Sequence, residues 1–331
     1  MRFSLIICTY HRPEALKILL ESVKRQTVLP HQILIIDGSR DYHTKSIIER
    51  GFIGNMKYYK VEEENRGLTR QRNFGVEKLN EDIEVVFFLD DDTILFPDYF
   101  EQILKTYREF PYALGVSGYI VNEQNWTEIR KNTMKSNKDF IFDGWTRKEG
   151  SRFILRKKFG LSPNVPPGFM PDFSHGYSSG FLPPSGKPYE VEMLMGGIAS
   201  YKKEVFEKLN FSSYFEGYGL YEDADFSLRV SKMGKLYVNT GAKVEHHHAV
   251  AGRPNKFIYG KMVVRNGWYV WRLKNPRPSL LAKIKWNATS FLLTLVRFSN
   301  VFNTKERVEA FTEAVGRTMG WFSLMFNKPK V

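Results

Sequence analysis

Three consecutive carboxylates, Asp90, Asp91 and Asp92, directly follow the apolar run Val85–Leu89. The run is apolar on both faces, which is typical of a strand buried inside a parallel sheet. Like charges at the end of such a strand repel one another, and burying them is costly unless a cation or hydrogen-bond donors meet them. The pattern therefore predicts either a divalent-metal site that also faces an anionic ligand, or a solvated acidic loop that caps the next helix.

A second group of acids opens the segment Tyr221–Val230, which has helical spacing. Glu222 and Asp223 would stand in its first turn, where carboxylates interact favourably with the helix dipole. The alternative is a general base that takes a proton from a reacting hydroxyl group. Four acids between Glu216 and Asp225 exceed what capping requires, and this favours Asp223 as the base. Asp225 and Arg229 are spaced for an ion pair.

The elements that must position these acids alternate between strands and helices. Such alternation predicts a doubly wound, mostly parallel sheet, in which ligands bind outside the carboxyl ends of the strands. Thr9, Tyr10 and Asp37 follow other expected strands, so we expect them at the same edge as the acidic triplet. The expected strands are Phe3–Cys8, Ile33–Ile36, Lys57–Val61, Val85–Leu89, Leu114–Val121, 235–238 and 243–245.

The region 122–190 lacks this regularity and is rich in glycine, proline, serine and aromatic residues. Its prolines argue against long regular elements, so we expect a long loop over the sheet edge. Long loops in compact domains often act as functional lids. After it, we expect a helix at Lys203–Leu209 and, from Asn255 onward, three helices separated at Pro276, Pro278 and Asn303-Thr304.

Length and composition bound the remaining alternatives. The chain has 331 residues and a net charge of +13, enough for a large α/β domain and a smaller appendage. The single cysteine, Cys8, excludes an intramolecular disulfide and agrees with a reducing compartment. The apolar run after Arg2 is too short for a signal peptide, and we find no apolar stretch of transmembrane length. We therefore expect a cytoplasmic protein with two regions, 1–252 and 253–331.

The motifs of the first region, taken in order, resemble a family 2 glycosyltransferase of the GT-A type. They are most similar to the bacterial members that build surface polysaccharides, including rhamnosyltransferase-like ones. The matching motifs are Cys8-Thr9-Tyr10-His11-Arg12, Ile36-Asp37-Gly38-Ser39, Asn65-Arg66-Gly67, Arg72-Asn73-Phe74-Gly75, Leu89-Asp90-Asp91-Asp92, Gly196-Gly197, Glu222-Asp223-Ala224-Asp225 with Arg229, and His246-His247-His248.

The resemblance implies an inverting, metal-dependent transfer of a hexosyl or deoxyhexosyl group from a UDP-, dTDP- or GDP-linked donor to a glycan or lipid-linked acceptor. In such an enzyme, the base, ribose and diphosphate of the donor would contact residues that follow the first strands or lie on the helix after them. These nucleotide-sugar ligands are Thr9, Tyr10, Arg12, Asp37, Arg72, Asp90 and Asp91.

The resemblance also implies a metal ligand set. Asp92 would contact Mn²⁺ or Mg²⁺ directly, and Asp90 would face the metal or the ribose. Both ions prefer oxygen ligands, which agrees with the acidic triplet. A histidine of the 246–248 cluster would be a further ligand, with His246 the best match and His248 on the same side of a strand. The alternative is that the histidines are exposed or structural.

Asp223 would be the catalytic base in such an enzyme. Glu222 and Gly196-Gly197 would contact the sugar or the acceptor, since glycine permits close approach of a backbone. The glycine pair could equally form a simple tight turn. Two other functions stay open on the sequence: a glycosyltransferase-like scaffold that binds a glycan or a membrane without turnover, and a metal-dependent hydrolase of nucleotide-linked substrates.

The C-terminal region 253–331 carries most of the positive charge, with eight lysines, seven arginines and three glutamates, which gives 15 − 3 = +12. Its stretch Trp286–Val296 has no charged residue and lies between basic residues. This composition favours a helix in the headgroup layer of a membrane over a soluble basic cap, and we find no nucleic-acid motif. The interfacial aromatic residues expected there are Trp268, Tyr269, Trp271, Trp286 and Trp321.

Overall fold

The structure of the chain is a computed structural model that describes residues 1–49, 54–130, 136, 138–248 and 254–331. The chain divides into two compact units, and each unit combines two separate stretches of the sequence. The first unit comprises Met1–Gln124 with Pro184–Arg253, and the second comprises Asn125–Pro183 with Pro254–Val331. Among the described residues, no helix is both long enough and apolar enough to cross a membrane.

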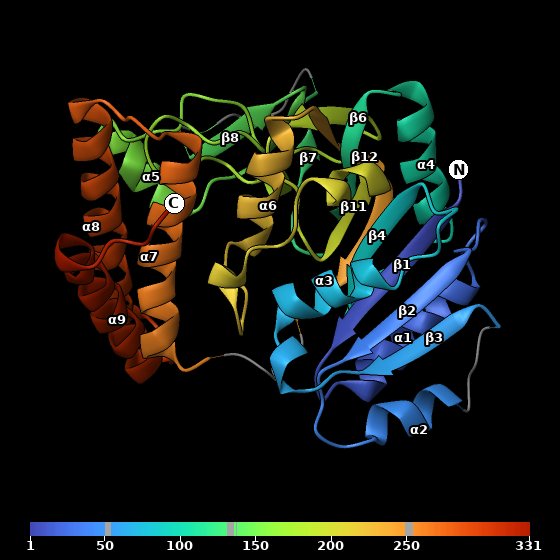
Figure 1. Cartoon of the computed structure of the whole chain (residues 1–331). Helices are drawn as coiled ribbons and strands as arrows, with labels where there is room; N and C mark the ends of the chain where they lie inside the picture. The colour runs from blue at the N-terminus through green and yellow to red at the C-terminus, as the bar shows by residue number, and fades with distance from the viewer. Residues whose placement is uncertain (50–53, 131–135, 137, 249–253) are drawn as a thin grey trace. The chain divides into compact units, whose positions relative to one another are not determined.

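The first unit is built on a nine-stranded mixed sheet in the order β10-β12-β6-β11-β4-β1-β2-β3, with β5 paired to β12 (Figure 1). The four strands from β4 to β3 are parallel, and β12 is parallel to β6, whereas β11 runs antiparallel between β4 and β6. The strands are β1 (Phe3–Thr9), β2 (Gln32–Asp37), β3 (Met56–Lys60), β4 (Val85–Asp90), β5 (Thr93–Leu95), β6 (Ala113–Ile120), β10 (Pro188–Val191), β11 (Ile198–Lys202) and β12 (Lys235–His246).

Strand register explains why the polar residues meet. Thr9 at the end of β1 lies opposite Asp37 of β2, and Cys8 lies opposite Asp90 of β4. The strands before these positions are buried on both faces, as their continuous apolar runs require. The carboxyl ends of three strands therefore present their polar residues at one edge of the sheet.

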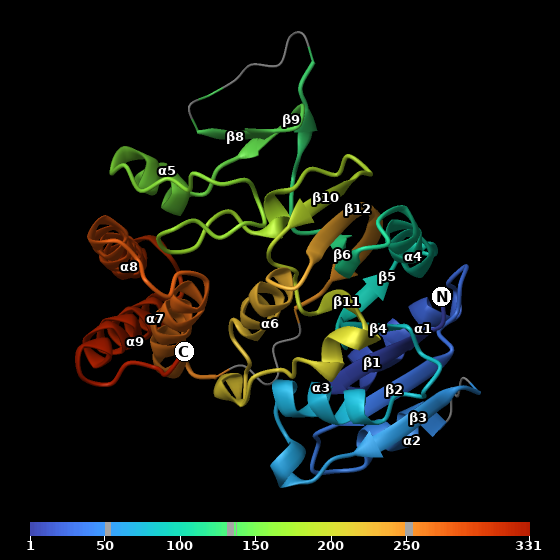
Figure 2. The ribbon, with the colours of Figure 1, turned by 45° about the horizontal axis from the view of Figure 1, so that its top comes forward.

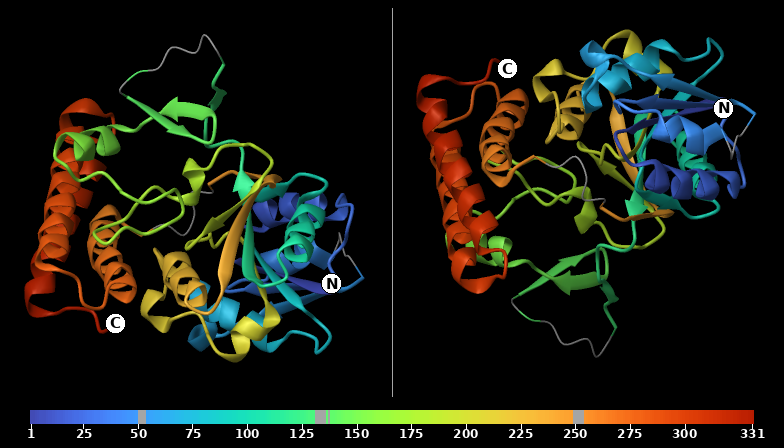
Figure 3. Two further views of the ribbon diagram at one scale, coloured as in Figure 1. Left: turned by 90° about the horizontal axis from the view of Figure 1, so that it is seen from above. Right: turned by 90° about the horizontal axis from the view of Figure 1, so that it is seen from below.

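Helices cover both faces of this sheet (Figures 1 and 3). The side chains of α1 (Pro13–Lys24), α2 (His43–Glu49) and α4 (Tyr99–Glu109) share one apolar core with β1, β2 and β4. On the opposite face, α3 (Leu68–Glu77) packs so closely that a Cβ atom on Gly75 would lie 2.8 Å from Ile6. On α6 (Glu222–Ser231), Phe226 stacks on Phe211 with ring centroids 4.1 Å apart.

Short 3₁₀ helices link these elements, and one of them replaces an expected α-helix. The segment expected as a helix at Lys203–Leu209 is the 3₁₀ helix η3 (Lys203–Glu207). The other 3₁₀ helices are η1 (Glu63–Asn65), η2 (Ser179–Phe181) and η4 (Ser213–Phe215).

The second unit contains the helices α7 (Lys256–Lys274), α8 (Leu280–Asn303) and α9 (Arg307–Phe326). Two glycines of this unit let α7 and α9 approach closely: a Cβ atom on Gly260 or Gly316 would lie 2.2 Å from a backbone oxygen of the other helix. The unit also has the short helix α5 (Ser151–Lys158) and a three-stranded sheet (Figure 2). Its strands are β7 (Thr127–Glu128), β8 (Asp139–Phe142) and β9 (Trp145–Lys148).

The α/β fold with a C-terminal helical extension is confirmed, and so are the helix breaks at Pro276, Pro278 and Asn303-Thr304. Two expectations were wrong in detail. The strands expected at 235–238 and 243–245 form the single strand β12, whose register shifts between Val238 and Lys243. The region 122–190 carries β7 to β9 and α5, although we expected a loop.

The tryptophans of the C-terminal region also differ from expectation. Trp268, Trp271 and Trp286 are buried, with exposed fractions of 9%, 2% and 5%. They form an apolar core with Leu324 and other residues of the second unit, so they are structural and do not supply an interfacial aromatic surface. The periodicity of α7 and α8 points them inward, and composition alone could not reveal this.

Candidate active site

The acidic triplet lies where β4 turns into β5. Because β5 pairs with β12 in antiparallel register, Thr93 lies opposite His246. This pairing brings His246 Nε2 to 3.1 Å from Asp92 Oδ1. One ligand atom each from Asp90, Asp92 and His246 lie within 4.8 Å of one another. The three residues therefore offer two carboxylates and one imidazole to a single cation.

A second cluster adjoins the first and was missed at the level of sequence. Glu123 Oε1 lies 2.7 Å from His248 Nε2 and 3.5 Å from His246 Nδ1. Asn122 next to it bonds both the backbone N–H and the carbonyl oxygen of His246. The signal was available, because Asn122-Glu123 follows β6 as the other polar residues follow their strands. We call the residues Asp90, Asp91, Asp92, Glu123, His246 and His248 the acidic edge.

Contacts within the acidic edge change the pKa values of its own side chains. Burial acts to lower the pKa of His246, but hydrogen bonds to Asp92 and Glu123 outweigh it and raise that pKa to about 10. The hydrogen bond from His246 in turn lowers the pKa of Glu123. An environment that holds a proton so firmly on an imidazole is one in which a divalent cation is also electrostatically favoured. The two carboxylates are the kind of donor that manganese and magnesium prefer, and the imidazole would add one nitrogen ligand.

Asp91 has a different environment from its two neighbours. Its carboxylate is buried and accepts hydrogen bonds from Thr9 Oγ1 at 2.7 Å and from Arg12 at 3.2 Å. Burial raises its pKa to about 6, although Thr9 and Arg12 oppose the shift. Arg12 also lies 3.4 Å from Asp92. Thr9 and Arg12 thus hold the acidic turn in shape, and their contact with a nucleotide stays a prediction.

Asp37 and Tyr10 lie on the β1–β2 side of this edge. Asp37 is fully buried, where it accepts bonds from the Ser39 backbone N–H and from the Tyr58 hydroxyl. Tyr10, by contrast, is 45% exposed and contacts His11 edge to face. Asp37 therefore anchors the loop after β2, while the Tyr10 ring is accessible for stacking on a base.

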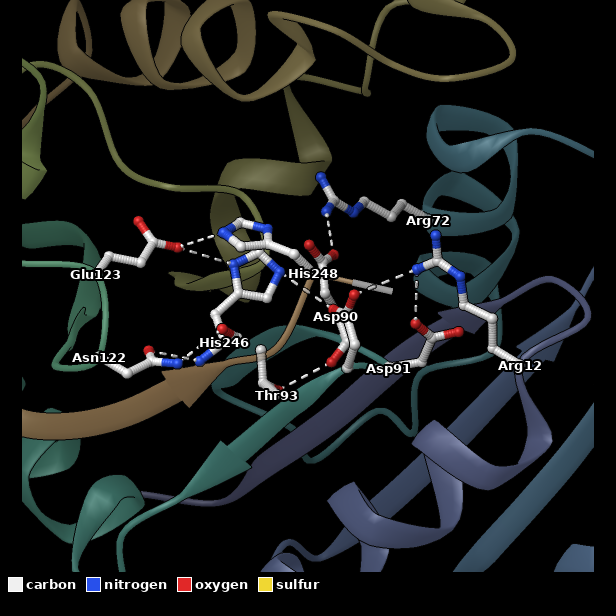
Figure 4. A network of polar contacts seen from close by, with 10 residues as sticks. Arg12, Arg72, Asp90, Asp91, Thr93, Asn122, Glu123, His246 and His248 are labelled. Carbon is white, nitrogen blue, oxygen red and sulfur yellow. Dashed lines mark hydrogen bonds and ion pairs between the residues drawn. The ribbon is translucent and has the colours of Figure 1, made fainter. Parts of the chain in front are cut away.

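Arg72 links the acidic edge to α6. Its guanidinium is buried, bonds Glu222 directly and lies 3.6 Å from Asp90 (Figure 4). Burial raises the pKa of Glu222 to about 8, against the lowering influence of Arg72. The rings of Phe88 and Phe211 lie 5.7 Å and 5.3 Å from the Arg72 guanidinium and complete its apolar surroundings. This arrangement fixes the first turn of α6 against β4.

Gly196 and Gly197 stand between the two groups of acids. A Cβ atom on Gly197 would lie 2.2 Å from Asp90, and one on Gly196 would lie 2.6 Å from Glu222. Asp223 is partly exposed, and its Oδ2 accepts the backbone N–H of Gly196 at 3.4 Å. Burial raises the pKa of Asp223. The glycine pair is thus sterically required, because the side chains of Asp90, Glu222 and Asp223 already occupy the space that a Cβ atom would need.

The structure brings together predicted residues of seven separate motifs at this edge. The pair of Asp225 with Arg229 is also confirmed, at 2.5 Å. It lies within α6 and is buried at the carboxylate, so it stabilises the helix that carries Asp223.

Comparison with known proteins places these motifs in context. A family model described as Glycosyl transferase family 2 matches residues 4–209. A glucosyl-dolichyl phosphate glucuronosyltransferase of Haloferax volcanii is 32% identical over 124 residues, which are 37% of this chain and 39% of that protein. The putative glycosyltransferase EpsH of Bacillus subtilis is 34% identical over 104 residues, which are 31% of this chain and 29% of that protein. The matches thus cover well under half of these relatives.

A structural similarity supports the fold alone. The crystal structure of GalNAc-T7 with UDP, GalNAc and Mn²⁺ superposes with a TM-score of 0.51 at 16% identity, over 80% of this chain and 47% of that chain.

Proposed function

Because the chain belongs to glycosyl transferase family 2, we propose that it moves a hexosyl or deoxyhexosyl group from a nucleotide sugar to a hydroxyl group of a glycan or lipid-linked glycan. The donor is UDP-, dTDP- or GDP-linked, and the product belongs to cell-surface polysaccharide synthesis. The similarity to a transferase whose name specifies a dolichyl phosphate-linked substrate supports a lipid-linked acceptor. We place the reaction at the cytoplasmic face of a membrane.

One observation carries this proposal: a metal-capable carboxylate group lies beside Gly197, and a separate carboxylate with a raised pKa lies beside the neighbouring Gly196. Asp90 is in contact with one glycine, and Asp223 accepts a bond from the backbone of the other. A displacement at an anomeric carbon needs this separation, because the leaving diphosphate and the attacking hydroxyl group lie on opposite sides of the sugar.

Asp90, Asp92 and His246 would hold Mn²⁺ or Mg²⁺, with His248 and Glu123 behind them. Such an ion supplies Lewis-acid stabilisation of the charge on a leaving diphosphate. Glu123 and Asn122 orient the His246 ring through its other nitrogen and its backbone, as outer partners of metal-ligating histidines do. Arg72 adds a fixed positive charge next to Asp90.

Asp223 would accept the proton of the acceptor hydroxyl group as its oxygen forms the bond to the anomeric carbon. The bond from that carbon to the diphosphate oxygen breaks in the same step, which inverts the configuration. Burial raises the pKa of Asp223 toward the range in which a carboxylate is an effective base. Glu222, bonded to Arg72, is the neighbouring group that would contact the sugar or the acceptor.

The nucleotide would lie over the β1–β2 side of the edge, with Tyr10 against the base and Asp37 behind it. Thr9, Arg12 and Asp91 would shape this end of the site through their shared hydrogen bonds.

The decisive experiment is a panel of UDP-, dTDP- and GDP-linked sugars, tested for thermal stabilisation of the protein with and without Mn²⁺. We expect one donor class to stabilise the protein, more strongly with the metal, and Asp92→Ala to remove the metal effect. With the donor known, transfer to an added glycan acceptor separates a transferase from a hydrolase, and the anomeric configuration of the product, measured by NMR, tests inversion. Absence of both transfer and hydrolysis with every donor would instead support a binding scaffold.

A further inference from the structure

One side of α8 carries large apolar side chains that face solvent. They recur at intervals of four and seven residues, which places them on one face of the helix. Their exposed fractions run from 47% to 83%, whereas the opposite side of α8 carries the buried Trp286 and Thr289. The α8 stripe consists of Leu280, Ile284, Phe291, Leu295 and Phe302.

A matching stripe runs along α9. Its members have exposed fractions from 48% to 90%, and the opposite side of α9 packs on α7 through Gly316 and Gly320. No charged residue interrupts this stripe between Phe311 and Phe326. The α9 stripe consists of Val308, Phe311, Met319, Phe322 and Phe326.

The two stripes face the same side, because α8 and α9 pack against each other as an antiparallel hairpin. Asn287 accepts a hydrogen bond from Trp321, Arg297 pairs with Glu313 at 2.9 Å, and the rings of Phe298 and Phe311 lie 6.0 Å apart. Along this line of contact, the residue numbers in α9 fall as those in α8 rise, so the two helices run antiparallel. Each stripe lies around its helix from this line of contact, toward the same side, and Phe311 stands at the border between the stripe and the contact. We call the two stripes together the hairpin face.

Positive charge gathers at one end of the hairpin face. Lys283 and Lys285 lie near the start of α8, and Lys328 and Lys330 follow the end of α9, which the antiparallel arrangement brings to the same end. No acidic residue occurs in α8. Of the two in α9, Glu313 is buried between Arg297 and Arg317, and Glu309, near the other end of the hairpin, pairs with Lys256 of α7. The face is therefore apolar along its length and basic at one end.

We infer that the hairpin face binds the surface of an anionic lipid membrane, with both helices lying flat in the headgroup layer. The length of α8, 24 residues or about 36 Å, gives a long apolar contact. Apolar side chains at this depth gain from leaving water, and lysines at the rim gain from anionic headgroups. Because the lysines complement anionic lipid headgroups, the partner of the hairpin face is a membrane surface. The inference concerns the second unit alone and does not depend on the proposed reaction.

The test is co-sedimentation of the full chain with phosphatidylcholine vesicles, with and without phosphatidylglycerol. We expect binding to the anionic vesicles and a loss of about tenfold in affinity for Ile284→Glu, because the change removes an aliphatic group that the lipid would bury and puts a charge in its place. The matched control is Ile18→Glu, since Ile18 is 52% exposed on α1 and Ile284 is 57% exposed on α8. The control should bind as the wild type does.

A second variant tests how much a lysine contributes to binding of anionic lipid. Lys283→Gln should weaken binding to anionic vesicles about fivefold and leave binding to pure phosphatidylcholine unchanged. The circular dichroism spectrum and the thermal unfolding temperature of all three variants, measured without any ligand, should equal those of the wild type, which verifies their folding.

Three outcomes would overturn the inference. The first is a wild-type chain that ignores anionic vesicles, and the second is an equal loss in Ile18→Glu and Ile284→Glu. The third is a wild-type dimer in sedimentation that Ile284→Glu separates into monomers without any vesicle binding, which would make a second copy the occupant of the hairpin face.

Discussion

The acidic edge of the first unit draws its residues from Asp90 to His248, whereas the hairpin face comes from the single stretch Leu280–Phe326. The acidic edge crowds carboxylates together, so each one needs a partner: the buried Asp91 has Thr9 and Arg12, and the exposed Glu123 has two histidines. The hairpin face exposes apolar side chains to water, so covering them with another apolar surface would be energetically favourable. A buried charge cluster is sensitive to the loss of any one partner, whereas an apolar face loses affinity in small increments.

This difference predicts that a substitution in one region leaves the function of the other unchanged, and that substitutions at the acidic edge have the largest effects. The sharpest case is Asp223→Asn, which removes the proposed base. We expect transfer to fall about a thousandfold while donor and vesicle binding stay unchanged. Initial rates and vesicle co-sedimentation measure the two responses. Asp98→Asn is the control, because Asp98 is also a partly buried aspartate at a helix start. Substantial transfer by Asp223→Asn would exclude this residue as the base.

The next effect in size concerns the glycine pair. A Cβ atom in Gly197→Ala would meet Asp90 at 2.2 Å, so the carboxylate must move. Because misplacement of about 1 Å costs catalysis heavily, we expect transfer to fall about a hundredfold. Gly54→Ala is the control, since a Cβ atom there meets nothing within 4 Å. Equal activity of the two variants would show that the position of Asp90 is unimportant.

A smaller effect is expected for the outer partner of the histidines. Glu123→Gln removes the carboxylate that faces His246 and His248, so we expect Mn²⁺ to bind about tenfold more weakly. Isothermal titration of Mn²⁺ in the presence of the nucleoside diphosphate measures the change. In the control Glu190→Gln, the lost partner is the exposed Lys235, and metal affinity should not change. Metal affinity equal to that of the wild type would place Glu123 outside the metal site.

The smallest effect is a shift in the pH profile. Burial raises the pKa of Asp223 above the ordinary 3.8, so the base is protonated, and transfer is lost, at a higher pH than for an exposed aspartate. The acidic limb of kcat/KM should therefore lie above pH 3.8, while vesicle binding through lysines stays level over the same range. If kcat/KM stayed constant down to pH 3.8, the raised pKa of the base would be contradicted. If vesicle binding decreased over the same pH range as kcat/KM, the independence of the two regions would be contradicted.

Much of both regions could be predicted from local pattern. The continuous apolar runs of β1, β2 and β4 indicated parallel strands, whose carboxyl ends meet at one edge and bring Thr9, Asp37 and Asp90 near one another. The prolines between α7 and α8 marked the helix break that precedes the hairpin. Composition misled us about Trp268, Trp271 and Trp286, because an aromatic residue near basic ones looks the same whether it faces lipid or a core.

The sequence by itself determined which residues carry charge, where the strands end and how the C-terminal helices are divided, because these properties depend on a residue and its near neighbours. Only the tertiary structure decided that His246 meets Asp92, that Glu123 joins them and that Gly197 has no room for a side chain. These contacts depend on the pairing of β5 with β12 and of β4 with β11, and local periodicity does not specify the register between distant strands. The same reason applies to the hairpin, where periodicity defines each stripe but only antiparallel packing turns both to one side.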